Sequence, residues 1–306
     1  MRPGWSARAE LRELLGERVR FDAPLARHTS LRVGGPADAL AAPRDRAELA
    51  RLLELCARHR LVQLVLGHGF NTLVLDGGVD GVVVQLAKLR RMEARPGPVL
   101  FAEAGVSHRQ LVNFCVERGL AGLEFGAGIP GTLGGWLAMN AGIPEREIGD
   151  AVREIEVMSP TGEKTRRLAR GSLEFRYRAL RGLAPGSVIV SALLDVAAAD
   201  AGVVRAEVAR LLAKRAASQP LDVPSCGSVF KNPPGDYAGR LIEAAGLKGE
   251  RVGDAEISPV HANFIANRGR ARAADVLALV EMARERVAKE FGIELEPEVR
   301  ILGRPS

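Results

Sequence analysis

The 306-residue sequence contains few aromatic residues, cysteines and histidines, and each shortage excludes a class of protein. Aromatic residues make up 4% of the chain, too few for a surface that stacks nucleic-acid bases. The three cysteines (Cys56, Cys115 and Cys226) form no CxxC pair, and we expect Cys56 and Cys115 to be small core residues. The five histidines form no HExxH or Cys/His cluster, so no metal site is expected.

Long apolar runs are also missing, and this bears on the compartment. No stretch reaches the ~18 apolar residues of a membrane span. Residues 1–5 lead straight into a charged helix and lack the apolar core of a signal peptide. We therefore expect a cytoplasmic protein without a membrane partner.

The positive charge rests on arginine, because only six of the 43 basic residues are lysine. Most arginines alternate with acidic residues, as around Glu281 and Arg284, which is typical of a solvated helix surface with i,i+3 pairs. The net charge of +6 suits the steering of anionic small molecules. No nucleic-acid-binding motif is present, so we expect no nucleic-acid partner and no obligate protein partner.

Helix and strand patterns alternate along the chain and predict an α+β fold. Asp45 and Glu48 form a candidate capping box, and Ser107 is a candidate cap for a second helix. The predicted helices cover residues 45–59, 107–118, 203–217, 237–245 and 272–290. The predicted strands cover residues 62–66, 82–84, 99–103, 153–158, 188–196, 263–266 and 299–301.

Glycine is abundant, with 34 residues, and two of its clusters have the pattern of an anion-binding loop. Gly67–Asn71 follows a predicted strand, and Gly126–Gly135 precedes a predicted short helix. Exposed backbone N–H groups in such loops, aided by a helix N-terminus, suit a diphosphate. Each loop alone is more simply a tight turn, but the two together favour a dinucleotide. Neither is a GxGxxG motif, and no P-loop is present.

Several motifs, in order along nearly the whole chain, carry a family resemblance. They are Thr29–Asp38, Gly128–Gly135, Met139–Gly142, Gln219–Leu221, Pro224–Pro233, Ala238–Glu243, Gly246–Gly249, His261–Ile265 and Leu295–Arg300. From about residue 20 to residue 303 the sequence resembles the UDP-N-acetylenolpyruvoylglucosamine reductases (the MurB family). The compact chain suits the shorter of the family's two forms.

The resemblance implies a fold and a reaction. Residues 1–200 would form an FAD-binding fold of the vanillyl-alcohol-oxidase (PCMH) type, with a subdomain boundary near residues 70–80. Residues 201–306 would form a C-terminal α+β substrate-binding domain. In this family NADPH reduces FAD, which then delivers hydride to an enolpyruvyl ether and gives UDP-N-acetylmuramate. That product is a peptidoglycan precursor, which would place the chain in cell-wall synthesis, cell shape and cell division.

The resemblance also implies residue roles. Arg178 would stabilise the enolate-like dianion, Ser228 would donate the proton and Glu298 would assist at the enol carbon. Taken singly, these residues are more simply a surface charge, a turn hydroxyl and a strand-edge carboxylate. The implied substrate-binding residues are Tyr177, Lys231, Asn232 and Asn263. The implied cofactor-binding residues are Gly67, His68, Gly69, Phe70, Asn71, Gly128, Ile129, Gly131, Thr132, Gly134, Gly135 and Asn140.

The sequence departs from the family pattern at four places, most of them around the expected flavin pocket. Phe70 and Leu180 stand where serine is usual, Trp136 replaces a small residue, and Pro144–Arg146 replaces a Tyr-Gly continuation. Trp136 could crowd the cofactor or could repack against it. Two alternatives to the reductase therefore stay open: a catalytically silent relative that binds flavin or a UDP-sugar, and a flavin oxidase of the same fold.

Overall fold

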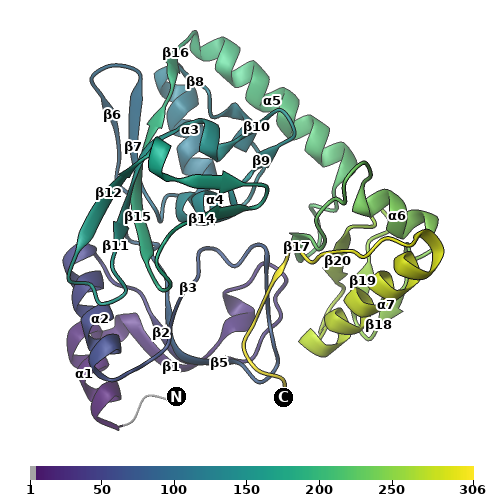
Figure 1. Ribbon diagram of the computed structural model, residues 1–306, viewed down its shortest axis with the longest axis horizontal. Coiled ribbons are helices and arrows are strands. Elements are labelled where there is room, and N and C mark those ends of the chain that lie inside the picture. Colours follow the sequence, from purple (N-terminus) through teal and green to yellow (C-terminus); the bar gives the residue numbers. More distant parts are fainter. Residues whose placement is uncertain (1–4) are drawn as a thin grey trace. The chain divides into compact units, whose positions relative to one another are not determined.

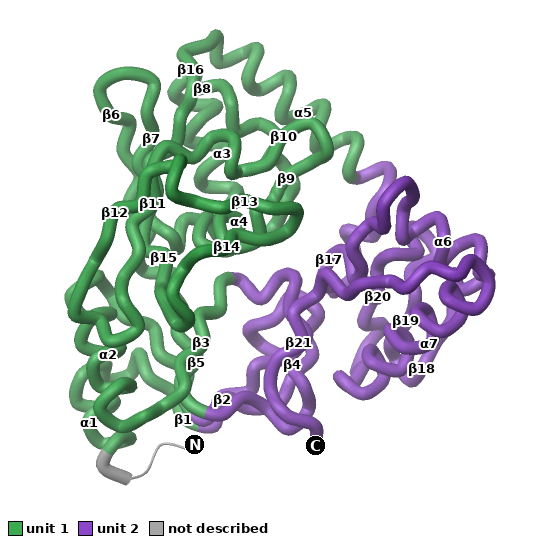
Figure 2. Tube along the Cα trace, viewed as in Figure 1, with its two compact units in different colours: residues 1–21, 39–67, 81–215 green, residues 22–38, 68–80, 216–306 purple. Residues whose placement is uncertain are grey.

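The computed structural model describes residues 5–306, which form two compact units built from interleaved segments (Figures 1 and 2). Unit 1 runs to Phe21 and adds residues 39–67 and 81–215. Unit 2 comprises residues 22–38, 68–80 and 216–306. Met1–Gly4, which belong to the N-terminal prediction, lie outside the described residues. Helices and antiparallel sheets occur in both units, which confirms the α+β class.

Unit 1 contains a five-stranded sheet in which all neighbours are antiparallel. In sheet order its strands are β12 (Thr165–Ala169), β11 (Val152–Met158), β15 (Val188–Asp195), β7 (Val99–Glu103) and β6 (Met92–Arg95). The helices are α1 (Trp5–Leu15), α2 (Arg46–Arg58), α3 (His108–Arg118), α4 (Leu133–Met139) and most of α5 (Ala201–Ser218). Leu111 and Cys115 of α3, with Trp136 and Leu137 of α4, form one buried core with apolar residues of this sheet.

Three short antiparallel strand pairs also belong to unit 1. They are β8 (Leu120–Ala121) with β16 (Ala197–Ala198), β9 (Gly142–Ile143) with β10 (Arg146–Glu147), and β13 (Glu174–Arg176) with β14 (Ala179–Arg181). The last two hairpins carry candidate site residues.

A second sheet contains strands through which the division between the units passes. Its order is β1 (Val19–Pro24), β2 (Pro36–Ala41), β5 (Val79–Val84) and β3 (Gln63–Val65). The unit 1 parts of these strands share a core with α1 and α2, in which Leu11, Leu49, Leu53 and Val82 are buried. The predicted division into residues 1–200 and 201–306 does not coincide with the compact units, and it stays a proposal about which ligand each part binds.

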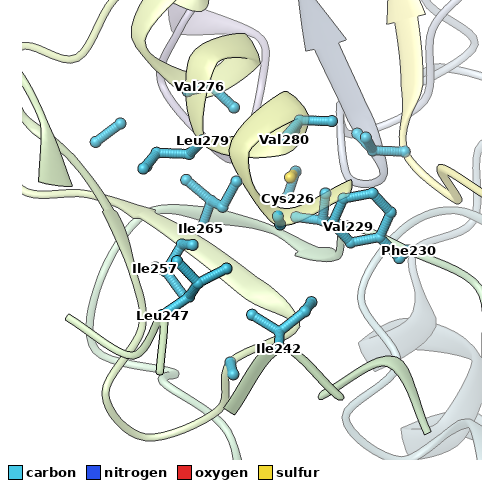
Figure 3. Packing of buried hydrophobic residues seen from close by; sticks show 14 of the residues in the cluster. Cys226, Val229, Phe230, Ile242, Leu247, Ile257, Ile265, Val276, Leu279 and Val280 are labelled. Carbon is cyan, nitrogen blue, oxygen red and sulfur yellow. The ribbon is translucent and has the colours of Figure 1, made fainter. Parts of the chain in front are cut away.

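Unit 2 contains a four-stranded sheet packed against the long C-terminal helix α7 (Ala273–Phe291) (Figure 3). The strands, in sheet order, are β17 (Ser225–Ser228), β20 (Phe264–Asn267), β19 (Ala255–Ile257) and β18 (Arg251–Val252). Val276, Leu279 and Val280 follow the helical i, i+3, i+4 spacing and pack in one cluster with Ile257 and Ile265. Helix α6 (Ala238–Ala244) contributes to the same core, and β21 (Arg300–Leu302) pairs in parallel with β4 (Thr72–Val74).

The predicted helices and strands are all present, with ends that shift by a few residues. The glycine-rich segment was predicted as a loop to Gly135, but α4 begins at Leu133, so this prediction is wrong for its last residues. The strands that were not predicted include the short hairpins, β1, β2, β6 and β12. The hairpin strands offer too few residues for a period-2 pattern to stand out, and β2 is buried at five consecutive positions and so shows no alternation.

The predicted capping box at α2 is half formed. Asp45 Oδ1 accepts from the Glu48 N–H at 2.8 Å, which confirms the cap. The Glu48 carboxylate instead accepts from the N–H of Arg44 at 2.7 Å and forms an ion pair with Arg18. Arg18, which is distant in the sequence, therefore binds the carboxylate that the predicted capping box would use.

The remaining predictions of core and surface can be checked directly. Cys56 and Cys115 are buried as predicted, and burial raises the pKa of both thiols to about 12. Arg284 pairs with Glu281 at 3.0 Å, as the charge pattern indicates. Within residues 5–306, no helix has the length and apolar character needed to cross a membrane.

Candidate active site

Ser228 and Glu298 lie on neighbouring backbone segments of unit 2. The Glu298 N–H donates to the carbonyl oxygen of Val229 at 2.8 Å, and the Lys231 N–H donates to that of Glu296 at 2.9 Å. Gly227 precedes Ser228 with φ +82°, a conformation that L side chains rarely adopt. Unit 2 therefore brings together two of the three predicted catalytic residues.

Asn71 ties the predicted cofactor loop to both of these segments. Its backbone N–H donates to the carbonyl oxygen of Cys226 at 3.1 Å, two residues before Ser228. Its Nδ2 donates to the carbonyl oxygen of Glu298 at 3.1 Å. The loop thereby fixes the backbone of the catalytic candidates, whatever its side chains also contact.

The N-terminal motif supports the same loop from the other side. The Ser30 N–H donates to the carbonyl oxygen of Gly69 at 3.1 Å, and the Ser30 hydroxyl donates to the carbonyl oxygen of Ser225 at 2.7 Å. A Cβ on Gly69 would lie 2.1 Å from the carbonyl oxygen of His28, so only glycine fits there. The motif around Ser30 thus has a structural use within unit 2.

The predicted substrate-binding residues of unit 2 differ in what their side chains contact. Lys231 Nζ pairs with Glu296, and Asn232 Oδ1 accepts from the Ala238 N–H at 3.1 Å. The amide of Asn263 is buried and bonds the backbone of Phe230 twice, with Oδ1 accepting at 2.9 Å and Nδ2 donating at 2.8 Å. We therefore assign Asn263 a positioning role for the Ser228 segment, and its predicted substrate contact stays a prediction.

In unit 1 we call residues 128–131 of the second glycine loop the cradle. Gly128 has φ +76° and Gly131 has φ +129°, so both are in regions that favour glycine. A Cβ on Gly67 would lie 2.7 Å from Thr132 Oγ1, so this glycine permits the close packing of the two predicted cofactor segments.

The N-terminus of α4, by contrast, is not available to an anion. The Leu133 N–H donates to the carbonyl oxygen of Val106 at 2.8 Å, and the Gly134 N–H to that of Ala104 at 2.9 Å. Thr132 Oγ1 accepts from the Gly135 N–H at 3.4 Å. We therefore assign packing and capping roles to Gly134 and Gly135, and the contribution of this helix terminus to cofactor binding stays a prediction.

Arg215, at the end of the unit 1 part of α5, lies over Gly128. Its Cδ would be 2.8 Å from a Cβ placed on that glycine. Burial lowers the pKa of the Arg215 guanidinium, and the positive charge of Arg178 lowers this pKa further. A partly buried cation beside a glycine backbone fits a diphosphate. Sequence reasoning missed Arg215 because nothing local separates it from the other arginines.

Trp136 supports the cradle from inside the core. The indole is buried, and its Nε1 donates to the carbonyl oxygen of Ile129 at 3.2 Å. A Cβ on Gly126 would lie 2.1 Å from the indole Cη2. Trp136 has therefore repacked beneath the loop, whereas Phe70 is partly exposed and Leu180 packs against the unit 1 core.

Arg178 occupies the two-residue turn of the β13–β14 hairpin. Its φ is +56°, a left-handed conformation that costs a non-glycine residue about 1 kcal/mol. Its Nη1 donates to Glu147 Oε1 at 3.3 Å, and its guanidinium carbon lies 4.7 Å from the centre of the Tyr177 ring. The Tyr177 ring is 46% exposed, so it can contact a ligand.

Asn140 holds this hairpin, and both of its side-chain polar atoms bond to protein groups. Its Nδ2 donates to Glu147 Oε2 at 2.5 Å and to the carbonyl oxygen of Arg176 at 3.1 Å, and its Oδ1 accepts from the Gly149 N–H at 3.0 Å. We therefore assign Asn140 a positioning role, and its predicted cofactor contact stays a prediction. Glu147 is a further site residue that sequence reasoning missed.

Two family models match the chain. One, described as the UDP-N-acetylenolpyruvoylglucosamine reductase C-terminal domain, matches residues 219–302. The other, described as an FAD binding domain, matches residues 37–166. The first covers the segment of Ser228 and Glu298, and the second covers the glycine cradle.

Relatives of similar length agree with these matches. UDP-N-acetylenolpyruvoylglucosamine reductase of Geobacter metallireducens is 50% identical over 97% of this chain and 96% of its own. The enzyme of Moorella thermoacetica is 45% identical over 96% of each chain. The crystal structure of the Thermus caldophilus enzyme matches with a TM-score of 0.80 and 37% identity, over 93% of this chain and 98% of its own. The chain therefore belongs to the UDP-N-acetylenolpyruvoylglucosamine reductase family.

Proposed function

We propose that the chain reduces UDP-N-acetylglucosamine-enolpyruvate to UDP-N-acetylmuramate with NADPH, in peptidoglycan precursor synthesis. The observation that carries the proposal is the pairing of the Ser228 and Glu298 segments, fixed by the 2.8 Å bond from the Glu298 N–H to Val229 and by Asn71. FAD, when bound, supplies the hydride that adds to the enolpyruvyl methylene carbon. We place this activity in the cytoplasm, with a UDP-sugar as the small-molecule partner.

The residues present fit FAD in each unit. In unit 1 we assign the diphosphate to the backbone of Gly128 and Gly131, with the guanidinium of Arg215 as counter-charge. In unit 2 we assign cofactor contacts to His68 and Phe70, at positions fixed by the packed Gly69. Burial lowers the pKa of His68, which favours its neutral form near pH 7.

The reaction requires a cation for the developing charge and a source of a proton. Arg178 is the cation that we assign to the substrate carboxylate, on which negative charge accumulates when hydride adds. The Ser228 hydroxyl donates its proton to the neighbouring carbon, and solvent then replaces that proton. We assign Glu298 to polarising the enol carbon, and Tyr177, Lys231 and Asn232 to binding the UDP-sugar.

A single preparation tests the proposed function. The purified protein should be yellow, lose its colour with NADPH under anaerobic conditions and regain it when the enolpyruvyl substrate is added. A protein that cannot take up FAD contradicts the proposal and favours the silent relative. Rapid consumption of oxygen without the substrate contradicts it in favour of the oxidase.

Replacing Trp136 by phenylalanine should weaken FAD binding without abolishing it. The variant keeps a ring beneath Gly126 but leaves the carbonyl oxygen of Ile129 without its indole donor, a loss of about 1 kcal/mol. If the whole of this loss weakens the binding of FAD by the cradle, the Kd for FAD should rise about five-fold in a titration of the apoprotein. Phe114→Leu, in α3 of the same core, is the control and should leave the Kd unchanged. An unchanged Kd in Trp136→Phe would show that the indole does not support the cradle.

A further inference from the structure

We propose that Glu147 is a positioning residue for Arg178, a role that rests on the proposed function. Glu147 ends β10, and Arg178 occupies the β13–β14 turn. The Arg178 Nη1 donates to Glu147 Oε1 at 3.3 Å, and its Nη2 lies 3.5 Å from the carbonyl oxygen of Gly142. Glu147 and Gly142 are partners in the β9–β10 register, so the two acceptors lie side by side.

The backbone around Glu147 is shaped to hold its side chain in this place. A Cβ on Gly142 would lie 2.5 Å from Glu147 Cα and 2.9 Å from its Cγ. A Cβ on Gly149 would lie 2.8 Å from Asn140 Oδ1. Both glycines therefore permit close contacts that any larger residue would disrupt.

Asn140 joins Glu147 to the hairpin that carries Arg178. One amide nitrogen donates both to Glu147 Oε2 and to the carbonyl oxygen of Arg176, two residues before Arg178. The same buried amide accepts from the Gly149 N–H, so it cannot rotate without losing a bond. Asn140, Gly142 and Glu147 thus form a clamp that fixes the guanidinium and its backbone together.

The charges of the clamp are better suited to positioning Arg178 than to stabilising the fold. The Arg178 and Glu147 side chains are 20% and 29% exposed, so solvent screens this pair less than a surface pair. Burial raises the pKa of Glu147, Arg178 opposes that rise, and Asp150 adds to it. The fold therefore places the Glu147 carboxylate where burial disfavours its charged form. A guanidinium held in advance needs no reorganisation when charge develops on the substrate.

Glu147→Gln tests this role, because glutamine keeps the shape and one acceptor but loses the charge. We expect the return of flavin colour on adding substrate to slow about 10- to 100-fold, the size of a catalytic group displaced by ~1 Å. The rate of bleaching by NADPH and the flavin absorbance spectrum should not change. The substrate KM should change less than kcat. Glu174→Gln, which breaks an exposed pair with Arg176 on the same hairpin, is the matched control and should stay within about two-fold.

Several outcomes would overturn the proposal. A normal return of colour in Glu147→Gln excludes the positioning role, and equal slowing of bleaching and reoxidation indicates a structural role instead. If the glutamine variant does not bind FAD, Glu147→Asp replaces it, because a carboxylate one methylene shorter withdraws from Nη1. Slowed reoxidation with normal bleaching then supports the role, and wild-type reoxidation contradicts it. Failure of the wild-type protein to be reoxidised by the substrate would instead contradict the proposed function.

Discussion

Ser228→Ala is expected to accept electrons from NADPH at the wild-type rate while its reoxidation by the enolpyruvyl substrate slows about 10²- to 10⁴-fold. The reason is that bleaching needs no proton at a substrate carbon, whereas completion of the product does. Alanine removes the hydroxyl but leaves the backbone that pairs with the Glu298 segment. Anaerobic stopped-flow absorbance of the flavin measures both steps in one protein.

Ser225→Ala is the control for the removal of a hydroxyl from the same strand. The carbonyl oxygen of Ser225 accepts a hydrogen bond from the Ser30 hydroxyl, and the alanine variant keeps this bond. We expect both steps to remain within about two-fold of wild type. Wild-type reoxidation in Ser228→Ala would remove Ser228 from the mechanism, and slower bleaching would show that the substitution disturbs the cofactor.

The elements of the fold were predictable wherever a local pattern specifies them. Ser107 caps α3 and forms a full capping box with Gln110, and the helical spacing in α7 places Val276 and Val280 in the core. These features depend on residues three or four apart, so the sequence alone contains them. The interleaving of segments into two units depends on contacts across the whole chain, and no local pattern predicts it.

In the candidate site, too, some residues could be predicted from the sequence and others could not. Motifs pointed to Ser228 and Glu298, and unit 2 places their segments side by side. The positioning roles that we assign were not predicted, because the partners of these residues are distant in sequence. Asn263 bonds the backbone of Phe230, and Asn140 bonds Glu147 and the β13–β14 hairpin. A buried amide that binds backbone looks, in a sequence, the same as an amide that binds a ligand.

Gly69→Ala is expected to destabilise unit 2 by about 3 kcal/mol and to prevent tight FAD binding. About 1 kcal/mol comes from placing an L residue at φ +68°, and about 2 kcal/mol from overpacking. The new Cβ would lie 2.1 Å from the carbonyl oxygen of His28 and 2.6 Å from Thr29 Cα, which are backbone atoms that cannot rotate away. Urea unfolding followed by circular dichroism measures the loss of stability.

Gly235→Ala separates the two contributions. Gly235 is also in unit 2 and has φ +80°, but a Cβ there would meet nothing within 4 Å. We therefore expect a loss of only about 1 kcal/mol and an unchanged Kd for FAD. Equal losses in the two variants would mean that conformation alone requires glycine at position 69. A larger loss of stability in Gly69→Ala, together with weakened FAD binding, would show that the contact with the N-terminal motif sets the position of the cofactor loop. Gly69 makes that contact and Gly235 does not.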